Sequence, residues 1–418
     1  MEVKNKSLSQ FNRHVLTLMT GTTIAQAIPI AISPVLTRIY SPEDFGLLAL
    51  FVAITATLSS VINGKYELAI MIPEKDDDAI HVAALGVLIA LFLSFLLLFF
   101  VVFFSAYFVR VLANDDIAPW LYLVPLVVLL NGIYNTLIYL NNRKMLYGSL
   151  AKSNIYRSVA NAGLQLLFGF FKFGGAGLIL GQFISLMLGV LSLIKNVIVG
   201  YAYKGVVRTQ LWVVAKKYSS FPKYTVFATL ANTLSQNIIS MLIPILYDIK
   251  TLGFYSLVQR VLGVPSSLVG EAVGQVFHRE VAEERRETGR GVISFNSTIK
   301  KLLVVGIPGF LFLYFIVIDL FVFVFGEKWQ LAGEYAQLLI PLFFMRFIVS
   351  SVSVMNTVFL KNKNGLYFQF SLLIMSLLVL YISNFIGLTD KEFLSLLNFI
   401  LSVVYMIFGI YLNRLKYG

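Results

Sequence analysis

Long apolar runs separated by short polar breaks fill the sequence from end to end. About twelve of them reach the roughly 20 residues that a membrane span needs. They lie near residues 13–37, 43–64, 81–109, 117–141, 150–173, 176–200, 222–247, 252–278, 302–326, 332–360, 366–387 and 393–413. Because backbone polar groups in lipid must be satisfied within the segment, these runs are expected to be helices. The pattern predicts an all-α integral membrane protein with about 12 transmembrane helices.

Composition supports this class. The chain of 418 residues is 58% hydrophobic and 13% charged, whereas soluble domains are about 45–50% apolar and about 25% charged. The absence of cysteine excludes disulfides, thiol nucleophiles and thiolate metal sites. The first residues show no cleavable signal pattern, so we expect no signal peptide.

Lysine and arginine predict the topology. If successive loops alternate between the two membrane faces, 24 of the 33 basic residues fall on the face that holds both termini, and only six fall on the other. Cytoplasmic loops carry such an excess, so both termini are predicted to be cytoplasmic. The net charge of +12 then reflects topology, and no nucleic-acid partner is expected.

Two pairs of segments recur in the same order. "NTLIYLNNRKMLYGSL" (135–150) matches "NTVFLKNKNGLYFQFSL" (356–372), with Asn135 opposite Asn356. "PVLTRIY" (34–40) matches "PILYDIK" (244–250). Spans one to six therefore recur as spans seven to twelve. Each half has an even number of spans, which predicts parallel repeats of six helices, as in two-lobed transporters. The expected lobes are residues 1–205 and 206–418.

The loops leave no room for a catalytic domain, so no enzyme is expected. No P-loop and no metal-ligand spacing occur, and no cofactor is expected. The acidic run Glu74–Asp78 is interpreted as a solvated loop rather than a metal site. The charged segment 277–301 is interpreted as a short interfacial helix.

Arg157, Arg260 and Arg346 fall near the middle of predicted spans, where an arginine is costly unless it faces a wet interior. They could instead hold helices together. If they line a cavity, its positive charge selects anions, and the guanidinium fork matches a pyrophosphate. Glu271 shares a helix with Arg260 and is a candidate for coupling to a proton or sodium ion. The remaining candidates for lining the cavity are polar: Gln26, Asn232, Gln236, Ser267 and Gln275.

Three segments carry a family resemblance: "YSPEDFGLLALFVAITATLSSVINGKYELAIMIP" (40–73), "FPKYTVFATLANTLSQN" (221–237) and "QRVLGVPSSLVGEAVGQVF" (259–277). The chain resembles the oligosaccharide flippases of bacterial O-antigen and capsule synthesis, within the multidrug/oligosaccharidyl-lipid/polysaccharide exporter superfamily. This resemblance implies two six-helix bundles arranged as a V. It implies transport of undecaprenyl-pyrophosphate-linked oligosaccharide units across the bacterial inner membrane, from the cytoplasmic to the periplasmic leaflet.

The resemblance also bears on single residues. Arg260 stands where the family commonly has arginine, whereas Arg157 stands where an amide is expected. Lys65 stands where arginine is usual, which adds it to the substrate-binding candidates. The expected partners are the lipid-linked glycan, membrane lipid and a proton or sodium counter-ion, with a polysaccharide polymerase and chain-length proteins as further candidates.

Three alternatives stay open. One is an ion-coupled small-molecule or drug antiporter of the same superfamily, which the excess of basic over acidic residues inside the spans disfavours. Another is a membrane enzyme of polysaccharide assembly, which the missing catalytic loop disfavours. The third is a carrier of the major facilitator type, whose characteristic inner loop after span two is absent.

Overall fold

The computed structural model describes residues 2–200 and 207–418, with side chains except those of residues 2–16, 264, 265, 267 and 271. Every regular element in these ranges is helical. The chain divides into two compact units, Met1–Thr233 and Leu234–Gly418, and the boundary falls inside helix α10.

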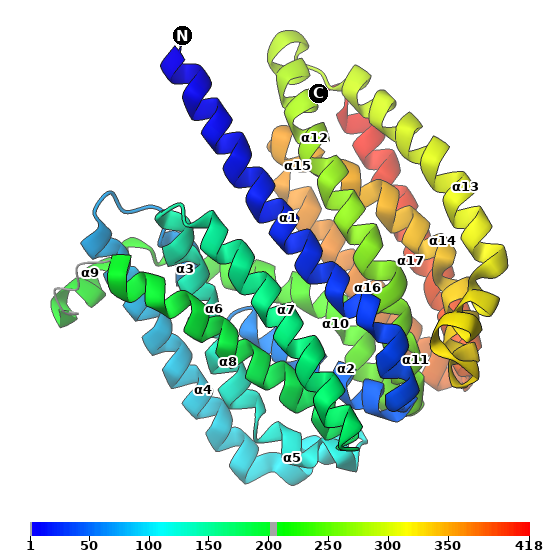
Figure 1. Ribbon diagram of the computed structural model, residues 1–418. Helices are drawn as coiled ribbons and strands as arrows, with labels where there is room; N and C mark the ends of the chain where they lie inside the picture. The colour runs from blue at the N-terminus through cyan, green and yellow to red at the C-terminus, as the bar shows by residue number, and fades with distance from the viewer. Residues whose placement is uncertain (1, 201–206) are drawn as a thin grey trace. The chain divides into compact units, whose positions relative to one another are not determined.

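The first unit holds the helices up to the start of α10 (Figure 1). They are α1 (Glu2–Ile39), α2 (Pro42–Ser59), α3 (Tyr66–Ala69), α4 (Asp76–Leu112), α5 (Ala118–Leu121), α6 (Val124–Arg143), α7 (Tyr147–Phe170), α8 (Gly175–Gly200), α9 (Arg208–Lys217) and α10 (Val226–Leu246). The second unit begins within α10. It continues through α11 (Ile249–Val258), α12 (Val264–Thr288), α13 (Val292–Phe325), α14 (Gln330–Val352), α15 (Met355–Val358), α16 (Asn362–Ile386) and α17 (Asp390–Leu415).

Among the described residues, ten helices are long and apolar enough to cross a membrane. They are α1, α2, α4, α6, α8, α10, α13, α14, α16 and α17. The other two expected spans, 150–173 and 252–278, are helical as well but more polar. Lys152 and Arg157 lie on α7, Arg260 precedes α12, and charged residues fill the second half of α12. The protein is therefore a multi-pass, all-helical membrane protein.

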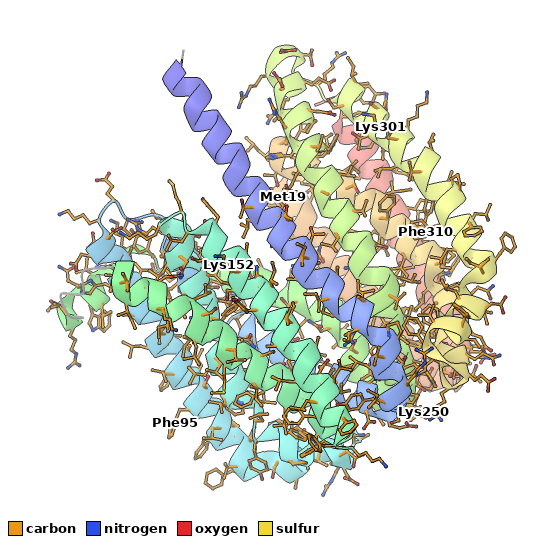
Figure 2. All side chains as sticks on the ribbon, viewed as in Figure 1. Met19, Phe95, Lys152, Lys250, Lys301 and Phe310 are labelled. Carbon is orange, nitrogen blue, oxygen red and sulfur yellow. The ribbon has the colours of Figure 1, made fainter. Side chains whose placement is uncertain are left out.

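The exterior of α4 shows what surrounds the first unit. Phe92, Phe95, Phe99 and Phe103 recur every three or four residues, and each is 49–72% exposed. Figure 2 labels Phe95 on this face. A helix face that leaves four rings uncovered is unfavourable in water and favourable in a lipid core. This face of α4 is the membrane-facing side of the first unit.

Helix α7 is central to the first unit, where it packs against α1 and α8. A Cβ atom on Gly21 of α1 would lie 2.4 Å from that of Ala151 on α7. The Ser158 hydroxyl donates a 2.7 Å hydrogen bond to the carbonyl of Ala25. In the second unit α14 is central and packs against α11, α12, α13 and α17. Small residues and satisfied hydroxyls thus let polar helices pack closely, as is typical in membranes.

The shorter sequence repeat ends in the same local structure in both units. Ser41 caps α2 by accepting a hydrogen bond from the Asp44 N–H, and Asp248 caps α11 by accepting one from the Thr251 N–H. Tyr40 and Tyr247 directly precede these caps. Burial first, and then a nearby aspartate charge, raises the pKa of each phenol to about 12.

The longer repeat is also present, but in a different register. Asn141, not Asn135, is the counterpart of Asn356. The backbone carbonyl of Asn141 accepts from the Leu146 N–H at 3.0 Å, and that of Asn356 accepts from the Lys361 N–H at 2.7 Å. A left-handed residue lies two positions after the end of each helix, Met145 after α6 and Leu360 after α15, with φ of 56° and 58°.

The side chains of these two asparagines each bond to a later helix of their unit, α8 for Asn141 and α17 for Asn356. Asn196 donates to Asn141, Tyr411 donates to Asn356, and each pair is separated by 55 residues in the chain. The Asn-Thr dipeptide does not mark the register, because the turn depends on the buried asparagine six residues before the next helix.

The expected interfacial helix at 277–301 is instead a helical hairpin. Helix α12 continues to Thr288, the chain turns at Gly289, and α13 begins at Val292. The Glu284 carboxylate accepts hydrogen bonds from the backbone N–H groups of Ile293 and Ser294 at 2.9 and 2.8 Å. Since this carboxylate satisfies the free N–H groups at the start of α13, the charged segment can extend both helices.

Candidate functional site

The second unit places two of the predicted arginines on one pair of packed segments. Arg260 lies in a π-helical turn, Gln259–Gly263, between α11 and α12. This turn packs against α14, which carries Arg346. Pro265 lacks the N–H that would bond four residues back, and the wider turn lies directly before it. Such π turns are frequent at functional sites.

Small residues bring α12 and α14 together below this turn. A Cβ on Gly270 would lie 2.7 Å from the Ser350 hydroxyl oxygen, and a Cβ on Gly274 would lie 3.3 Å from the carbonyl oxygen of Ser351. A side chain at Gly274 would press on the backbone of α14, whereas one at Gly270 would displace the Ser350 hydroxyl. The glycines fix the distance between the segments that carry Arg260 and Arg346.

Two tyrosines lie near Arg346, and Gln259 directly precedes Arg260 in the chain. Arg346 lies within electrostatic reach of Tyr255 on α11 and Tyr405 on α17. The Gln259 amide donates a 2.7 Å hydrogen bond to the Tyr255 hydroxyl oxygen. Both arginines remain partly accessible. We call Tyr255, Gln259, Arg260, Arg346 and Tyr405 the arginine cluster. Its positive charge and several hydrogen-bond donors suit an anionic group.

Arg157 is positioned by contacts within the first unit. Its guanidinium lies over the Tyr134 ring, 5.0 Å from the ring centre. The Tyr134 hydroxyl donates to the Asn154 side chain at 3.0 Å. A Cβ on Gly189 of α8 would come within 3.4 Å of the Arg157 side chain and 3.1 Å of the Tyr134 ring. Arg157, which lies on α7, therefore packs against α6 and α8. The cation–π contact with Tyr134 offsets part of the free energy of burying its charge.

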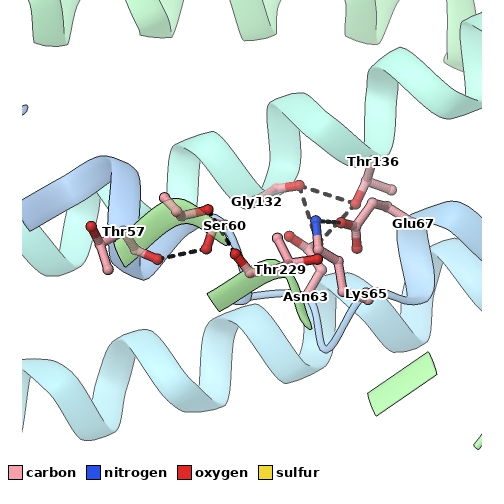
Figure 3. A network of polar contacts seen from close by, with 9 residues as sticks. Thr57, Ser60, Asn63, Lys65, Glu67, Gly132, Thr136 and Thr229 are labelled. Carbon is pink, nitrogen blue, oxygen red and sulfur yellow. Dashed lines mark hydrogen bonds and ion pairs between the residues drawn. The ribbon is translucent and has the colours of Figure 1, made fainter. Parts of the chain in front are cut away.

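Lys65 lies in the first unit, just after α2, and is ion-paired. Its Nζ is 3.2 Å from an oxygen of Glu67, and the two side chains are 15% and 5% exposed. Its backbone φ of 62° is left-handed. Beside this pair, the Asn63 amide donates to the Gly132 carbonyl and the Thr136 hydroxyl (Figure 3). Glu67 received no role from the sequence, although the Lys-Tyr-Glu spacing could have suggested the pair.

The predicted polar residues are spread over both units. Gln26 on α1 and Asn232 on α10 are half-buried in the first unit. Gln236 on α10 and Gln275 on α12 are exposed in the second. The side chains of Ser267 and Glu271 lie outside the described residues, so the proposed ion-coupling role of Glu271 stays a prediction.

The acidic run Glu74–Asp78 is tied to the end of α6. Asp76 pairs with Arg143 at 2.9 Å and with Lys144 at 2.5 Å. Within the described part of the chain, no group of three or more histidines and carboxylates is placed to hold a metal ion. The Asp76 carboxylate therefore serves ion pairing with the end of α6.

Comparisons with known proteins agree with this picture. A family model described as "Polysaccharide biosynthesis protein" matches residues 35–333, more than half of the chain. No curated protein matches the chain in sequence.

Solved structures match over nearly the whole chain. An inward-facing multidrug resistance MATE family transporter of the MOP superfamily is 12% identical, covers 95% of both chains and has a TM-score of 0.63. The lipid II flippase MurJ, in an inward closed conformation, is 16% identical, covers 97% of this chain and 87% of its own, and has a TM-score of 0.60. The multidrug transporter DinF-BH is 13% identical, with 95% coverage of both chains and a TM-score of 0.63.

At such identities the likeness establishes the fold alone, which the chain shares with these transporters and this flippase. The family match establishes more, and the chain belongs to the family of polysaccharide biosynthesis proteins.

Proposed function

We propose that the protein is a flippase that moves undecaprenyl-pyrophosphate-linked oligosaccharide units from the cytoplasmic to the periplasmic leaflet of a bacterial inner membrane by alternating access. The observation that carries this proposal is the arginine cluster of the second unit, in a chain of a polysaccharide biosynthesis family. The basic residues gathered on one face support cytoplasmic termini. A lipid-linked substrate is also handled by the lipid II flippase that shares the fold.

The chemistry of the cluster fits the head group. A pyrophosphate presents several anionic oxygens, and a guanidinium can donate two parallel hydrogen bonds to one phosphate. The tyrosines and Gln259 offer neutral donors and aromatic faces that suit the first sugars. Transport requires that the cluster bind the head group in one state of the cycle and release it in another. A proton or sodium ion that binds at Glu271 is proposed to cause the difference in head-group affinity between the two states. A polymerase with its chain-length protein would then consume the translocated glycan.

An ion-coupled drug antiporter is the second candidate, because two of the structures with this fold are multidrug transporters. A cation exporter needs acidic groups facing its cargo. The described polar groups near the π turn and Arg346 include two arginines, two tyrosines and a glutamine. This charge favours an anionic head group.

The test is transport by purified protein in proteoliposomes. One assay follows translocation of an undecaprenyl-pyrophosphate-linked oligosaccharide, and a second follows uptake of a fluorescent drug cation in the same vesicles. Arg260→Ala and Arg346→Ala are compared with Arg290→Ala, which removes an exposed arginine from the hairpin turn. We expect the wild type and Arg290→Ala to transport the glycan, and Arg260→Ala and Arg346→Ala to lose this transport. Drug uptake without glycan translocation would reject the flippase and support the antiporter.

A further inference from the structure

We propose that α9 is an interfacial anchor that binds the anionic phospholipid head groups of the leaflet around the first unit. The helix lies in the connection between α8 and α10, and its outward face has no role in the proposed transport. The proposal rests on the protein spanning a membrane and is independent of the substrate.

One face of α9 fixes the helix to the first unit. Val214 is 3% exposed, and Tyr218, which directly follows the helix, is 6% exposed; both pack with Tyr66 and Val82. The Tyr66 hydroxyl donates a 3.1 Å hydrogen bond to the carbonyl of Ala215. The Val207 N–H, just before the helix, donates to His81 at 3.1 Å. The helix is therefore firmly attached beside α3 and the first turns of α4 (Figure 1).

This attachment sets the depth of α9 relative to the membrane. Helix α4 is a candidate span from Asp76 to Leu112, and α9 contacts its beginning. The next candidate span begins at Phe221, four residues after α9 ends. A helix held between the ends of two spans lies at the level of the lipid head groups.

The opposite face of α9 has the residue types that this level favours. Arg208, Trp212 and Lys216 are spaced four residues apart, so they form one row on the helix. All three are exposed, Trp212 by 74%. Tryptophan is enriched at the membrane interface, where its ring enters the lipid and its N–H stays hydrated. A tryptophan between two cations therefore matches a surface of acidic head groups.

Trp212 itself can report the contact. The protein is reconstituted into vesicles of phosphatidylcholine or of phosphatidylglycerol. The contribution of Trp212 is the difference in fluorescence between the wild type and Trp212→Phe, which avoids altering Trp120 and the buried Trp329. Acrylamide measures its access to water, and brominated acyl chains measure its contact with lipid.

In phosphatidylglycerol, we expect Trp212 to lose acrylamide quenching and gain bromolipid quenching relative to phosphatidylcholine. R208Q/K216Q should lose this response, whereas R290Q/K301Q, which removes two exposed charges elsewhere, should keep it. Equal acrylamide access in both lipids would overturn the proposal and indicate a surface for something other than lipid. An unchanged response in R208Q/K216Q would overturn the role assigned to charge.

Discussion

The basic candidates of the two units differ in how they are held. In the first unit, Lys65 is ion-paired with Glu67 and Arg157 lies on the ring of Tyr134. In the second, Arg260 lies in a π-helical turn that packs against the helix carrying Arg346, and Tyr255 and Tyr405 lie within electrostatic reach of Arg346. A buried cation that serves packing alone is stabilised by a carboxylate or by an aromatic ring. Two arginines on adjoining segments offer several hydrogen-bond donors to one anionic ligand. We propose that the first two cations stabilise the fold and that Arg260 and Arg346 bind the head group.

The largest expected effect concerns the ion pair of the first unit. Lys65→Met leaves the Glu67 carboxylate buried without its cation, which costs about 3–5 kcal/mol when a buried pair is broken. We expect a large fall in the thermal unfolding midpoint of the purified protein. Lys65→Met/Glu67→Met removes both charges and should recover most of the loss. A double variant that is stable but inactive in glycan export would place Lys65 in substrate binding instead and break the comparison.

The next effect concerns the arginine cluster. Losing a charged hydrogen bond costs about 1.5–3 kcal/mol, which is about ten- to a hundred-fold in binding. Arg260→Ala and Arg346→Ala should therefore stop surface-glycan export while the protein still accumulates in membranes. Lysine at either position keeps the charge but loses the paired hydrogen bonds, so partial export is expected. Export and membrane protein level are measured together, because a parallel loss of both would point to a structural role.

A smaller effect is expected at Arg157. The cation–π contact is worth about 0.5–2 kcal/mol, depending on exposure. Arg157→Gln and Tyr134→Leu should each lower the unfolding midpoint, and the double variant should lose less than the sum of the two. This coupling is measured by a double-mutant cycle in detergent. Strict additivity would show that the two side chains do not stabilise each other.

The smallest effect lies in the hairpin between α12 and α13. Burial disfavours the charge of Glu284, but hydrogen bonds from the side chain of Ser294 and from backbone N–H groups outweigh it and hold the pKa of Glu284 below its usual range. A lowered folded-state pKa stabilises the protein above the unfolded value of about 4.3, and the contribution disappears as pH falls through the folded value. The difference in unfolding midpoint between the wild type and Glu284→Gln should therefore shrink below about pH 4. A constant difference down to lower pH would exclude the carboxylate charge as its cause.

Helices and membrane class were predictable from the sequence because the apolar runs are long and local. The repeat was predictable in outline, but its register was not. The equivalence of Asn141 and Asn356 depends on bonds to Asn196 and Tyr411, which lie 55 residues away. Similarly, the charged segment after Phe277 resembles an interfacial helix by composition, and only the capping of α13 by Glu284 makes it a hairpin.

The sequence predicted the site only as a set of charged residues that are unfavourable inside a membrane span. Intramembrane arginines are visible in the sequence, but the partners that separate packing from binding come from other helices. Tyr134 lies 23 positions before Arg157, and Tyr405 lies 59 positions after Arg346. The pairing of Lys65 with Glu67, two residues apart, was within reach of the sequence. The π turn at Arg260 was foreshadowed only by Pro265.

Equilibrium binding of undecaprenyl pyrophosphate to the protein in lipid nanodiscs measures whether the arginine cluster holds the head group. We expect the dissociation constant to rise about ten- to a hundred-fold in Arg260→Ala and in Arg346→Ala, as the loss of a charged hydrogen bond requires. Arg157→Gln should bind as the wild type does. Wild-type affinity in both alanine variants, with each protein folded, would contradict the assignment of the arginine cluster to the head group.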